Sequence, residues 1–367
     1  MEIKAAVARE QGGQLSLESL SLEEPRSDEI LVRVVATGVC HTDLVVIAGH
    51  LPTPFPVVLG HEGAGIVEQV GSGITKVKPG DHVVMTYNSC GTCPSCSDHA
   101  SSYCHEFFPR NFFAVRADGS SALSGDDGSL VHGNFFGQSS FATHALCHET
   151  NVVKVSETLP LELLGPLACG IQTGAGAVIN ALKVSVGRSL VVFGTGSVGL
   201  SAVMAAKVVG ASTIIAVDMN DDRLAMAKEL GATHTLNPGK DNVGEQVMAI
   251  TGFGVDFALD TTGIPAVIRD AVETLAPRGT CGILGAPAPE TQIELDETHF
   301  MSGGRRLIGI VEGDANPDTF IPMLADLNAK GMFPFDRLVK FYNLDQINQA
   351  IEDSESGKTI KPIIRMS

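Results

Sequence analysis

The sequence predicts an α/β protein of two domains, one built mostly of β-strands and one with a doubly wound parallel sheet. At 367 residues the chain is long enough for two hydrophobic cores. Short Val- and Ile-rich runs separated by glycines, such as residues 29–35 and 65–70, fill the part up to about residue 110 and are typical of a twisted β domain. From about residue 171 to 310, apolar strands alternate with helical segments, which predicts the parallel sheet.

The second domain opens with a strand, a glycine turn, a helix, a second strand and an acid. Residues 190–193 are a short apolar run, Gly194-Thr-Gly196-Ser-Val-Gly199 follows, and residues 212–217 lead to Asp218. Such glycines let a pyrophosphate approach the backbone and the helix N-terminus. A bare glycine loop is weak evidence, but this context predicts a dinucleotide site. The candidate cofactor contacts are Gly194, Gly196, Ser197, Val198, Gly199, Asp218 and Arg223.

Asp218 decides which dinucleotide this site favours. A carboxylate at the end of the second strand accepts the adenosine ribose hydroxyls and repels a 2′-phosphate. The sequence therefore predicts NAD rather than NADP, with Arg223 as a further ribose or adenine contact.

Four cysteines lie in one short stretch, at Cys90, Cys93, Cys96 and Cys104. Four thiolates at about 2.3 Å form the closed shell of a structural Zn²⁺ site. Disulfides or chance are the alternative, but no secretory signal at the N-terminus favours oxidation. A zinc knuckle also occurs in nucleic-acid-binding proteins, so other features must separate the two classes.

Charge and hydropathy argue against nucleic acid and membrane. The net charge is −17 and no Lys/Arg cluster is present, so a phosphate backbone would be repelled. The apolar stretch 189–217 resolves into strand, turn, helix and strand rather than one span. The eight cysteines, most of them assigned to metal, fit a reducing compartment, so we expect a cytoplasmic protein.

A second constellation of metal-binding side chains lies outside the four-cysteine stretch. His61 and Cys169 each stand next to a glycine, and Cys40 follows Gly38 by two residues. Two cysteines and one histidine leave the fourth position of a zinc ion open, as in a catalytic site. Taken singly, each is as readily a buried thiol or a core histidine, and spacing alone does not link them.

Taken in order, these motifs resemble the zinc-dependent alcohol dehydrogenases of the medium-chain family, and most of all the aryl-alcohol (benzyl-alcohol) dehydrogenases. The resemblance covers essentially the whole chain. It implies a GroES-like zinc catalytic domain of residues 1–170 and 311–367 and an NAD-binding Rossmann domain of residues 171–310. It also implies two Zn²⁺ per chain, a catalytic ion on Cys40, His61 and Cys169 and a structural ion on the four-cysteine stretch.

The resemblance also implies roles for residues around the catalytic ion. Asp43 would orient the histidine ligand, and Thr42 would take the substrate proton. Glu62 would lie behind the metal as a transient ligand. Thr173 would contact the nicotinamide. His41 and Lys361 match positions that hold the pyrophosphate, where many relatives carry arginine.

Two differences from the family pattern, together with the expected pocket residues, indicate the substrate class. Val45 stands where many relatives have a relay histidine, and Leu51 and Phe108 replace an acid and an arginine expected of a glutathione-dependent formaldehyde dehydrogenase. A slot lined by aromatic side chains favours a substrate with a flat ring. The alternative is that Phe135 and Phe136 are ordinary core residues. The expected pocket comprises Leu51, Tyr87, Phe135, Phe136, Leu284, Ala286 and Ile310.

The expected function is oxidation of a primary aromatic alcohol to its aldehyde with hydride transfer to NAD. One alternative is a dehydrogenase or reductase of the same fold acting on another primary alcohol or aldehyde. A more distant alternative is a non-catalytic protein that binds NAD and zinc. The expected partners are small aromatic alcohols and aldehydes and further copies of the chain, as a tetramer rather than a dimer.

Overall fold

The computed structural model describes residues 1–285 and 290–366, and the chain divides into two compact units. Unit 1 comprises Met1–Cys169, Asn316–Ala329 and Phe335–Ser367, and unit 2 comprises Gly170–Ala315 and Lys330–Pro334. The predicted second boundary, after residue 310, lies five residues before the end of the segment Gly170–Ala315. Residues 311–315 belong to unit 2 because Glu312 and Gly313 contact the first helix of that unit.

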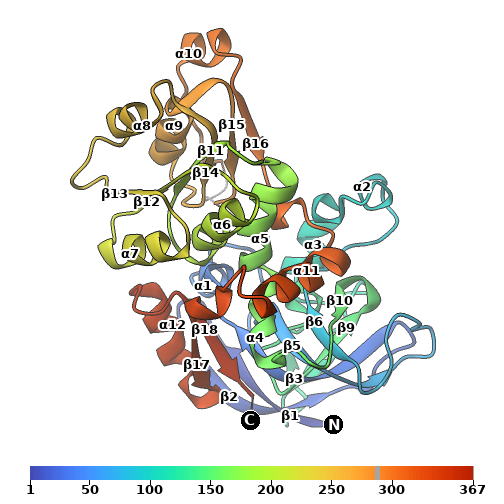
Figure 1. The fold of residues 1–367 in the computed structure, drawn as a ribbon. Helices are drawn as coiled ribbons and strands as arrows, with labels where there is room; N and C mark the ends of the chain where they lie inside the picture. The colour runs from blue at the N-terminus through green and yellow to red at the C-terminus, as the bar shows by residue number, and fades with distance from the viewer. Residues whose placement is uncertain (286–289, 367) are drawn as a thin grey trace. The chain divides into compact units, whose positions relative to one another are not determined.

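Unit 1 is built around two sheets whose neighbouring strands are antiparallel except for one parallel pair, Val339–Asn343 beside Lys361–Arg365 (Figure 1). Its strands are β1 (Glu2–Ala8), β2 (Leu15–Leu22), β3 (Glu29–Gly38), β4 (Val57–Val58), β5 (Glu62–Val70), β6 (His82–Met85), β7 (Leu123–Ser124), β8 (Leu130–Val131), β9 (His144–His148), β10 (Val152–Lys154), β17 (Val339–Asn343) and β18 (Lys361–Arg365). One sheet has the order β4-β1-β2-β7-β8 and the other the order β10-β6-β5-β3-β18-β17, with β9 also on β3. The predicted β domain is confirmed in these strands.

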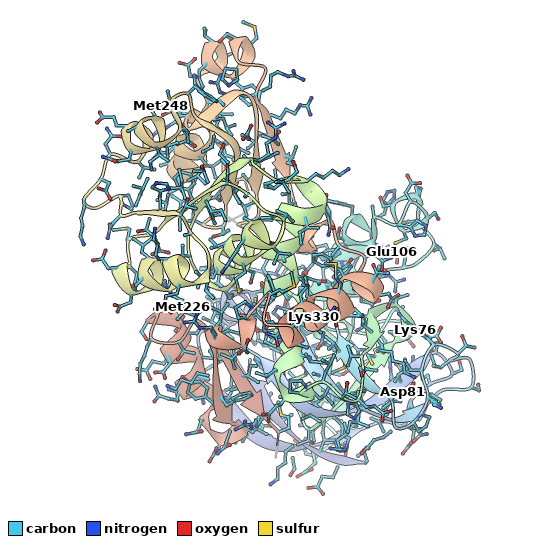
Figure 2. The ribbon with its side chains drawn as sticks, viewed as in Figure 1. Lys76, Asp81, Glu106, Met226, Met248 and Lys330 are labelled. Atoms are coloured by element: carbon cyan, nitrogen blue, oxygen red, sulfur yellow. The ribbon has the colours of Figure 1, made fainter. Side chains whose placement is uncertain are left out.

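The helices of unit 1 range in length from four to thirteen residues. They are α1 (His41–Ile47), α2 (Pro94–Ser97), α3 (Phe107–Phe112), α4 (Leu161–Leu164), α11 (Pro317–Ala329) and α12 (Ile347–Glu355). Helix α11 returns to unit 1, where Asp318 in its first turn pairs with Lys76 at 2.7 Å (Lys76 is labelled in Figure 2). This ion pair ties a late segment of the chain to the early β domain.

Unit 2 is a parallel sheet with helices around it (Figure 1). Its strands are β11 (Ser189–Phe193), β12 (Thr213–Val217), β13 (His234–Leu236), β14 (Val255–Asp260), β15 (Leu275–Ile283) and β16 (Arg306–Gly309). Its helices are α5 (Gly170–Gly176), α6 (Ser197–Val208), α7 (Asp221–Leu230), α8 (Val243–Thr251), α9 (Pro265–Glu273) and α10 (Glu297–Ser302).

The strand order of unit 2 confirms the doubly wound prediction. Within the described residues the order is β13-β12-β11-β14-β15-β16, and each neighbouring pair is parallel. Central strand β11 is covered on both faces, so it reads as a continuous apolar run, with Leu190, Val191 and Val192 fully buried. The order reverses between β11 and β14, and such sheets bind ligands at the carboxyl ends of the strands there.

Among the described residues, no single helix is long and apolar enough to cross a membrane. The bent helix pair Leu161–Ala168 and Gly170–Ala181 is together long and apolar enough to span a membrane, but only its length and composition point that way.

Candidate functional site

Four candidate metal ligands that are distant in the sequence come together in unit 1. Cys40 is the N-cap of α1, Cys169 ends the segment before unit 2, and His61 and Glu62 stand where β5 begins. One ligand atom from each lies within 4.8 Å of the others, and the Sγ atoms of Cys40 and Cys169 are 3.9 Å apart. Two thiolates bound to one zinc ion at about 2.3 Å would be separated by about 3.8 Å. The structure thus joins residues that spacing alone could not link.

Asp43 fixes the orientation of His61. Its Oδ1 lies 3.0 Å from Nδ1 of His61 and accepts from the Gly60 amide at 3.1 Å, while its Oδ2 accepts from the Cys40 amide at 3.0 Å. Because a carboxylate only accepts, Nδ1 carries the proton and Nε2 is left with its lone pair. Asp43 therefore positions two of the candidate ligands at once.

The donor set fits a cation. Nε2 of His61 is buried and has no hydrogen-bond partner among the described residues, which is costly unless a ligand satisfies it. A hydrogen bond from the Cys169 thiol lowers the pKa of Cys40, which favours the thiolate that a metal requires. Two cysteines and a histidine can therefore hold a zinc ion and leave one position open.

Lys361 has partners that the sequence did not lead us to expect. It was expected to hold the pyrophosphate, but its ammonium is buried and lies 2.9 Å from both carboxylate oxygens of Glu62. It also donates to the carbonyl of Val39 at 3.3 Å. Burial opposes the charge of Lys361, yet attraction by Glu62 outweighs it and raises the pKa of Lys361. In the structure this ammonium is thus directed at Glu62 and Val39.

Helix α1 carries the residues expected to move the substrate proton. Thr42 is half-buried, and its Oγ1 lies 3.9 Å from the Sγ of Cys40. His41 is exposed at the first turn, and Val45 is half-buried one turn later. The structure thus brings Thr42 next to the candidate metal ligands and leaves His41 open to solvent.

The second cluster of candidate ligands is formed by Cys90, Cys93, Cys96 and Cys104 around the short helix α2. Their sulfur atoms all lie within 4.8 Å of one another, and those of Cys90 and Cys96 are 3.9 Å apart. A hydrogen bond from the Thr92 amide lowers the pKa of Cys90 to about 6, whereas burial raises the pKa of Cys96 to about 12. Four thiolates this close need a cation to ionise together, and a tetrahedral zinc ion fits them.

Aromatic side chains surround His61. Phe136 stacks on its ring with centroids 4.5 Å apart and an interplanar angle of 28°, and Phe135 meets it edge-on at 5.6 Å. Phe136 adopts a left-handed backbone conformation with φ +51°, which is strained for an aromatic residue. The amide of Gln138 holds this turn by donating to the His61 carbonyl and accepting from the Gly63 amide, each at 3.0 Å.

The other expected pocket residues differ in their placement. Phe135, Phe136 and Tyr87 are all buried in the core of unit 1, and the Tyr87 hydroxyl lies 2.9 Å from Oγ of Ser101. Phe136 differs from the other two in that its ring stacks on His61. Leu51 is half-buried in unit 1, whereas Leu284 and Ile310 belong to unit 2. Ala286 lies outside the described residues.

The glycine turn of unit 2 has the shape that a pyrophosphate requires. Gly194 has φ +87°, and a Cβ on Gly199 would lie 1.9 Å from the carbonyl oxygen of Gly194, so neither position accepts a side chain without strain. A Cβ on Gly196 would instead point into open space. Ser197 and Val198 begin α6 directly after this opening. The residues therefore fit a dinucleotide at the start of α6.

Asp218 lies opposite this turn and is held by it. Its Oδ2 accepts from the amide and the hydroxyl of Thr195 at 2.7 and 2.8 Å, and its Oδ1 accepts from the Asn220 amide at 2.9 Å. Arg223 is half-buried in α7, and its Nε has no hydrogen-bond partner among the described residues. Thr173, on α5, bonds to Glu312.

The sequence interpretation did not include Thr195 or Glu312. Thr195 lies inside the glycine motif. Its hydroxyl could have been expected to bond to Asp218, the acid that ends the following strand. Glu312 gave no signal, because its partners Gln172 and Thr173 are about 140 residues away.

The comparisons with known proteins agree with both units. Residues 26–157 match the model of the alcohol dehydrogenase GroES-like domain, and residues 197–329 match that of the zinc-binding dehydrogenases. A geraniol dehydrogenase of Castellaniella defragrans is 48% identical over 98% of this chain and 97% of its own. Solved structures of related fold hold NADP or NADH.

Two solved structures are similar along the whole chain. A zinc-binding-domain alcohol dehydrogenase from Burkholderia ambifaria is 54% identical, with a TM-score of 0.99 over 100% of this chain and 99% of the other. A benzyl alcohol dehydrogenase from Acinetobacter calcoaceticus is 49% identical, with a TM-score of 0.97 over 100% of both chains. With both domain models matched and near-half identity across its length, this chain belongs to the zinc-dependent medium-chain alcohol dehydrogenases.

Proposed function

We propose that this alcohol dehydrogenase oxidises benzyl-type primary alcohols to aldehydes, with zinc and NAD as its cofactors. The observation that carries the substrate class is the Phe136 ring stacked on His61 at 4.5 Å, because it places an aromatic face directly beside a candidate metal ligand. Aromatic faces favour flat substrates through area burial and offset stacking. The similar benzyl alcohol dehydrogenase is in keeping with this class.

Cys40, His61 and Cys169 are the residues we propose to hold the catalytic ion. When bound, zinc supplies a Lewis acid that lowers the pKa of an alcohol hydroxyl. Asp43 keeps Nε2 of His61 directed at the ion, and Thr42 accepts the proton of the substrate hydroxyl. Cys90, Cys93, Cys96 and Cys104 hold a second ion that ties their loop together and takes no part in the reaction.

NAD is the dinucleotide we propose, with hydride transfer from the alcohol carbon to its nicotinamide ring. Asp218 accepts the ribose hydroxyls at Oδ1, which within the described residues accepts from the Asn220 amide, while a 2′-phosphate would meet this carboxylate with like charge. Gly196 leaves open space for the pyrophosphate. Thr173 is the residue we propose to contact the nicotinamide, and the exposed side chain of His41 is proposed to contact the phosphates.

A second candidate substrate is an allylic alcohol, because the 48% identical relative is a geraniol dehydrogenase. Geraniol and benzyl alcohol share a primary carbinol attached to an sp² carbon. A wall formed by Phe136 suits either compound, so the two candidates differ in the length of pocket they need rather than in chemistry.

A steady-state screen tests the proposal. The alcohols are benzyl alcohol, geraniol, ethanol and propanol, each with NAD⁺ and with NADP⁺, and kcat/KM is compared across the set. Benzyl alcohol with NAD⁺ is expected to lead. A higher kcat/KM for geraniol than for benzyl alcohol would favour the second candidate. A kcat/KM for ethanol equal to both would contradict an aromatic-lined site.

We also propose a cytoplasmic homo-oligomer. All eight cysteines lie in the described part of the chain and none forms a disulfide, which is in keeping with a reducing compartment. Size-exclusion chromatography with light scattering tests the oligomer, for which we expect a tetramer.

A further inference from the structure

An acidic turn in unit 2 has a backbone conformation that residues with side chains avoid. In the turn η6 (Glu312–Asp314) the φ angles of Glu312, Gly313 and Asp314 are +52°, +69° and +49°. Glycine adopts this left-handed region freely, but the two acids are strained there. Strain of this kind persists only where the surrounding structure fixes it, and it gathers at functional sites.

The two strained acids face different surroundings. Asp314 is exposed, whereas the side chain of Glu312 is buried against α5. Oε2 of Glu312 accepts from Nε2 of Gln172 at 3.1 Å and from Oγ1 of Thr173 at 3.3 Å. Two donors on one oxygen favour the charged carboxylate. As a carboxylate, Glu312 brings a negative charge to the residue we propose as a nicotinamide contact.

The backbone of this turn cannot move away from α5. The side chain of Asn180 donates to the Gly313 carbonyl at 3.2 Å. A Cβ on Gly313 would lie 2.5 Å from the carbonyl oxygen of Gln172, and one on Gly176 would lie 2.3 Å from the carbonyl oxygen of Gly313. Two glycines therefore allow the backbones to touch, and this contact fixes the Glu312 carboxylate opposite Thr173.

We propose that Glu312 is a positioning residue for the nicotinamide end of the cofactor and acts through Thr173. This inference rests on the proposed function, in which Thr173 contacts the nicotinamide. Since a carboxylate only accepts, the Thr173 hydroxyl must donate to it, and its oxygen is then left to accept from the N–H of the carboxamide. The same negative charge favours the cationic oxidised ring over the neutral reduced ring.

The experiment uses the zinc-loaded full chain and the variants Glu312→Gln, Glu312→Gly and Asp314→Gly. Dissociation constants are measured for NADH by fluorescence and for NAD⁺ by competition, alongside thermal denaturation. Glu312→Gln removes the charge but keeps an acceptor, so binding of NAD⁺ should weaken about fivefold more than binding of NADH. Glu312→Gly relieves the strain and removes the acceptor, so both cofactors should bind more weakly while the Tm is unchanged or higher.

Asp314→Gly is the matched control, because it relieves the same backbone strain without touching the buried carboxylate. Its cofactor affinities should equal those of the wild type. Unchanged affinities in both Glu312 variants would overturn the proposal. Equal weakening of NAD⁺ and NADH together with a lower Tm would show that Glu312 only supports the fold. If the wild type binds NADH but oxidises no alcohol, the proposed function fails while this inference about binding stands.

Discussion

Lys361 and Glu62 form a buried ion pair in which one ammonium lies 2.9 Å from both oxygens of one carboxylate. Burial raises the pKa of Glu62 to about 7, and the charge of Lys361 opposes this rise. The pair stands beside the candidate metal ligands, since Glu62 belongs to the same cluster as Cys40 and Cys169. Lys361 thereby supplies a positive charge behind the site and engages both oxygens of Glu62.

Removing that ammonium should destabilise unit 1 strongly. Lys361→Met removes the charge that opposes the rise in the pKa of Glu62, so Glu62 must stay buried as a carboxylate that lacks this ammonium or take up a proton, and breaking such a pair costs up to about 3–5 kcal/mol. Urea denaturation at pH 7, with zinc content matched, measures the loss. The double variant Glu62→Gln/Lys361→Met should recover part of it, because no uncompensated charge remains. Additive losses in the double variant would show that the pairing contributes little.

The two metal clusters should respond differently to loss of one cysteine. The wild type should hold two zinc ions per chain. Cys169→Ser should retain one ion and most of its Tm but lose turnover, because an open site contributes little to folding. Cys96→Ser should also retain one ion but lose stability, because a closed site stabilises its loop. Elemental analysis and thermal denaturation of the same samples check this. A fully stable Cys96→Ser protein that cannot transfer hydride would contradict the division of roles.

The Thr195 hydroxyl should sharpen the preference for NAD. It donates to Oδ2 of Asp218 at 2.8 Å and restrains the carboxylate. In Thr195→Val the carboxylate can rotate away from a 2′-phosphate, so the ratio of NADPH to NADH dissociation constants should fall about fivefold. Thr195→Ser keeps the hydroxyl and serves as the control. An unchanged ratio in the valine variant would mean that the Thr195 amide alone holds Asp218.

The parts of the site that rest on local patterns could be predicted from the sequence. The glycine turn, Asp218 and the four-cysteine stretch each lie within a few tens of residues, and the chemistry of each depends on local spacing. The Rossmann-type sheet followed from strands that read as continuous apolar runs because both faces are covered.

Long-range partners could not be predicted in this way. Glu62 and Lys361 are 299 residues apart, and a lysine near the C-terminus reads from sequence as a surface cation or a phosphate ligand. Phe135 and Phe136 are adjacent and identical in type, yet only Phe136 has the strained conformation that stacks it on His61. Which side chain faces the site depends on a turn whose conformation Gln138 fixes from tertiary contacts.

Phe136 should determine the preference for aromatic alcohols. Burying a phenyl ring rather than a methyl group adds on the order of 2 kcal/mol, and stacking adds about 1 more. This corresponds to roughly a hundredfold advantage in kcat/KM for benzyl alcohol over ethanol. Phe136→Leu should reduce that ratio to about tenfold by removing the stacking and part of the buried area. Phe108→Leu is the control, because Phe108 is exposed and stacks on Phe112 rather than on His61.

The valine at position 45 leads to a prediction about how the substrate proton reaches solvent. Valine neither accepts nor donates a proton, so Thr42 has no terminal base one turn further along α1, and exposed His41 or water must complete the path. A missing base costs about 10²-fold or less in proton transfer, and the cost shows in turnover only if that step limits it. Alcohol oxidation should therefore accelerate with small-amine buffer at fixed ionic strength, and Val45→His should blunt this response. His41→Gln should steepen it if His41 is the normal exit. A solvent isotope effect near unity, together with rates insensitive to buffer in all three proteins, would show that another step, such as cofactor release, limits turnover.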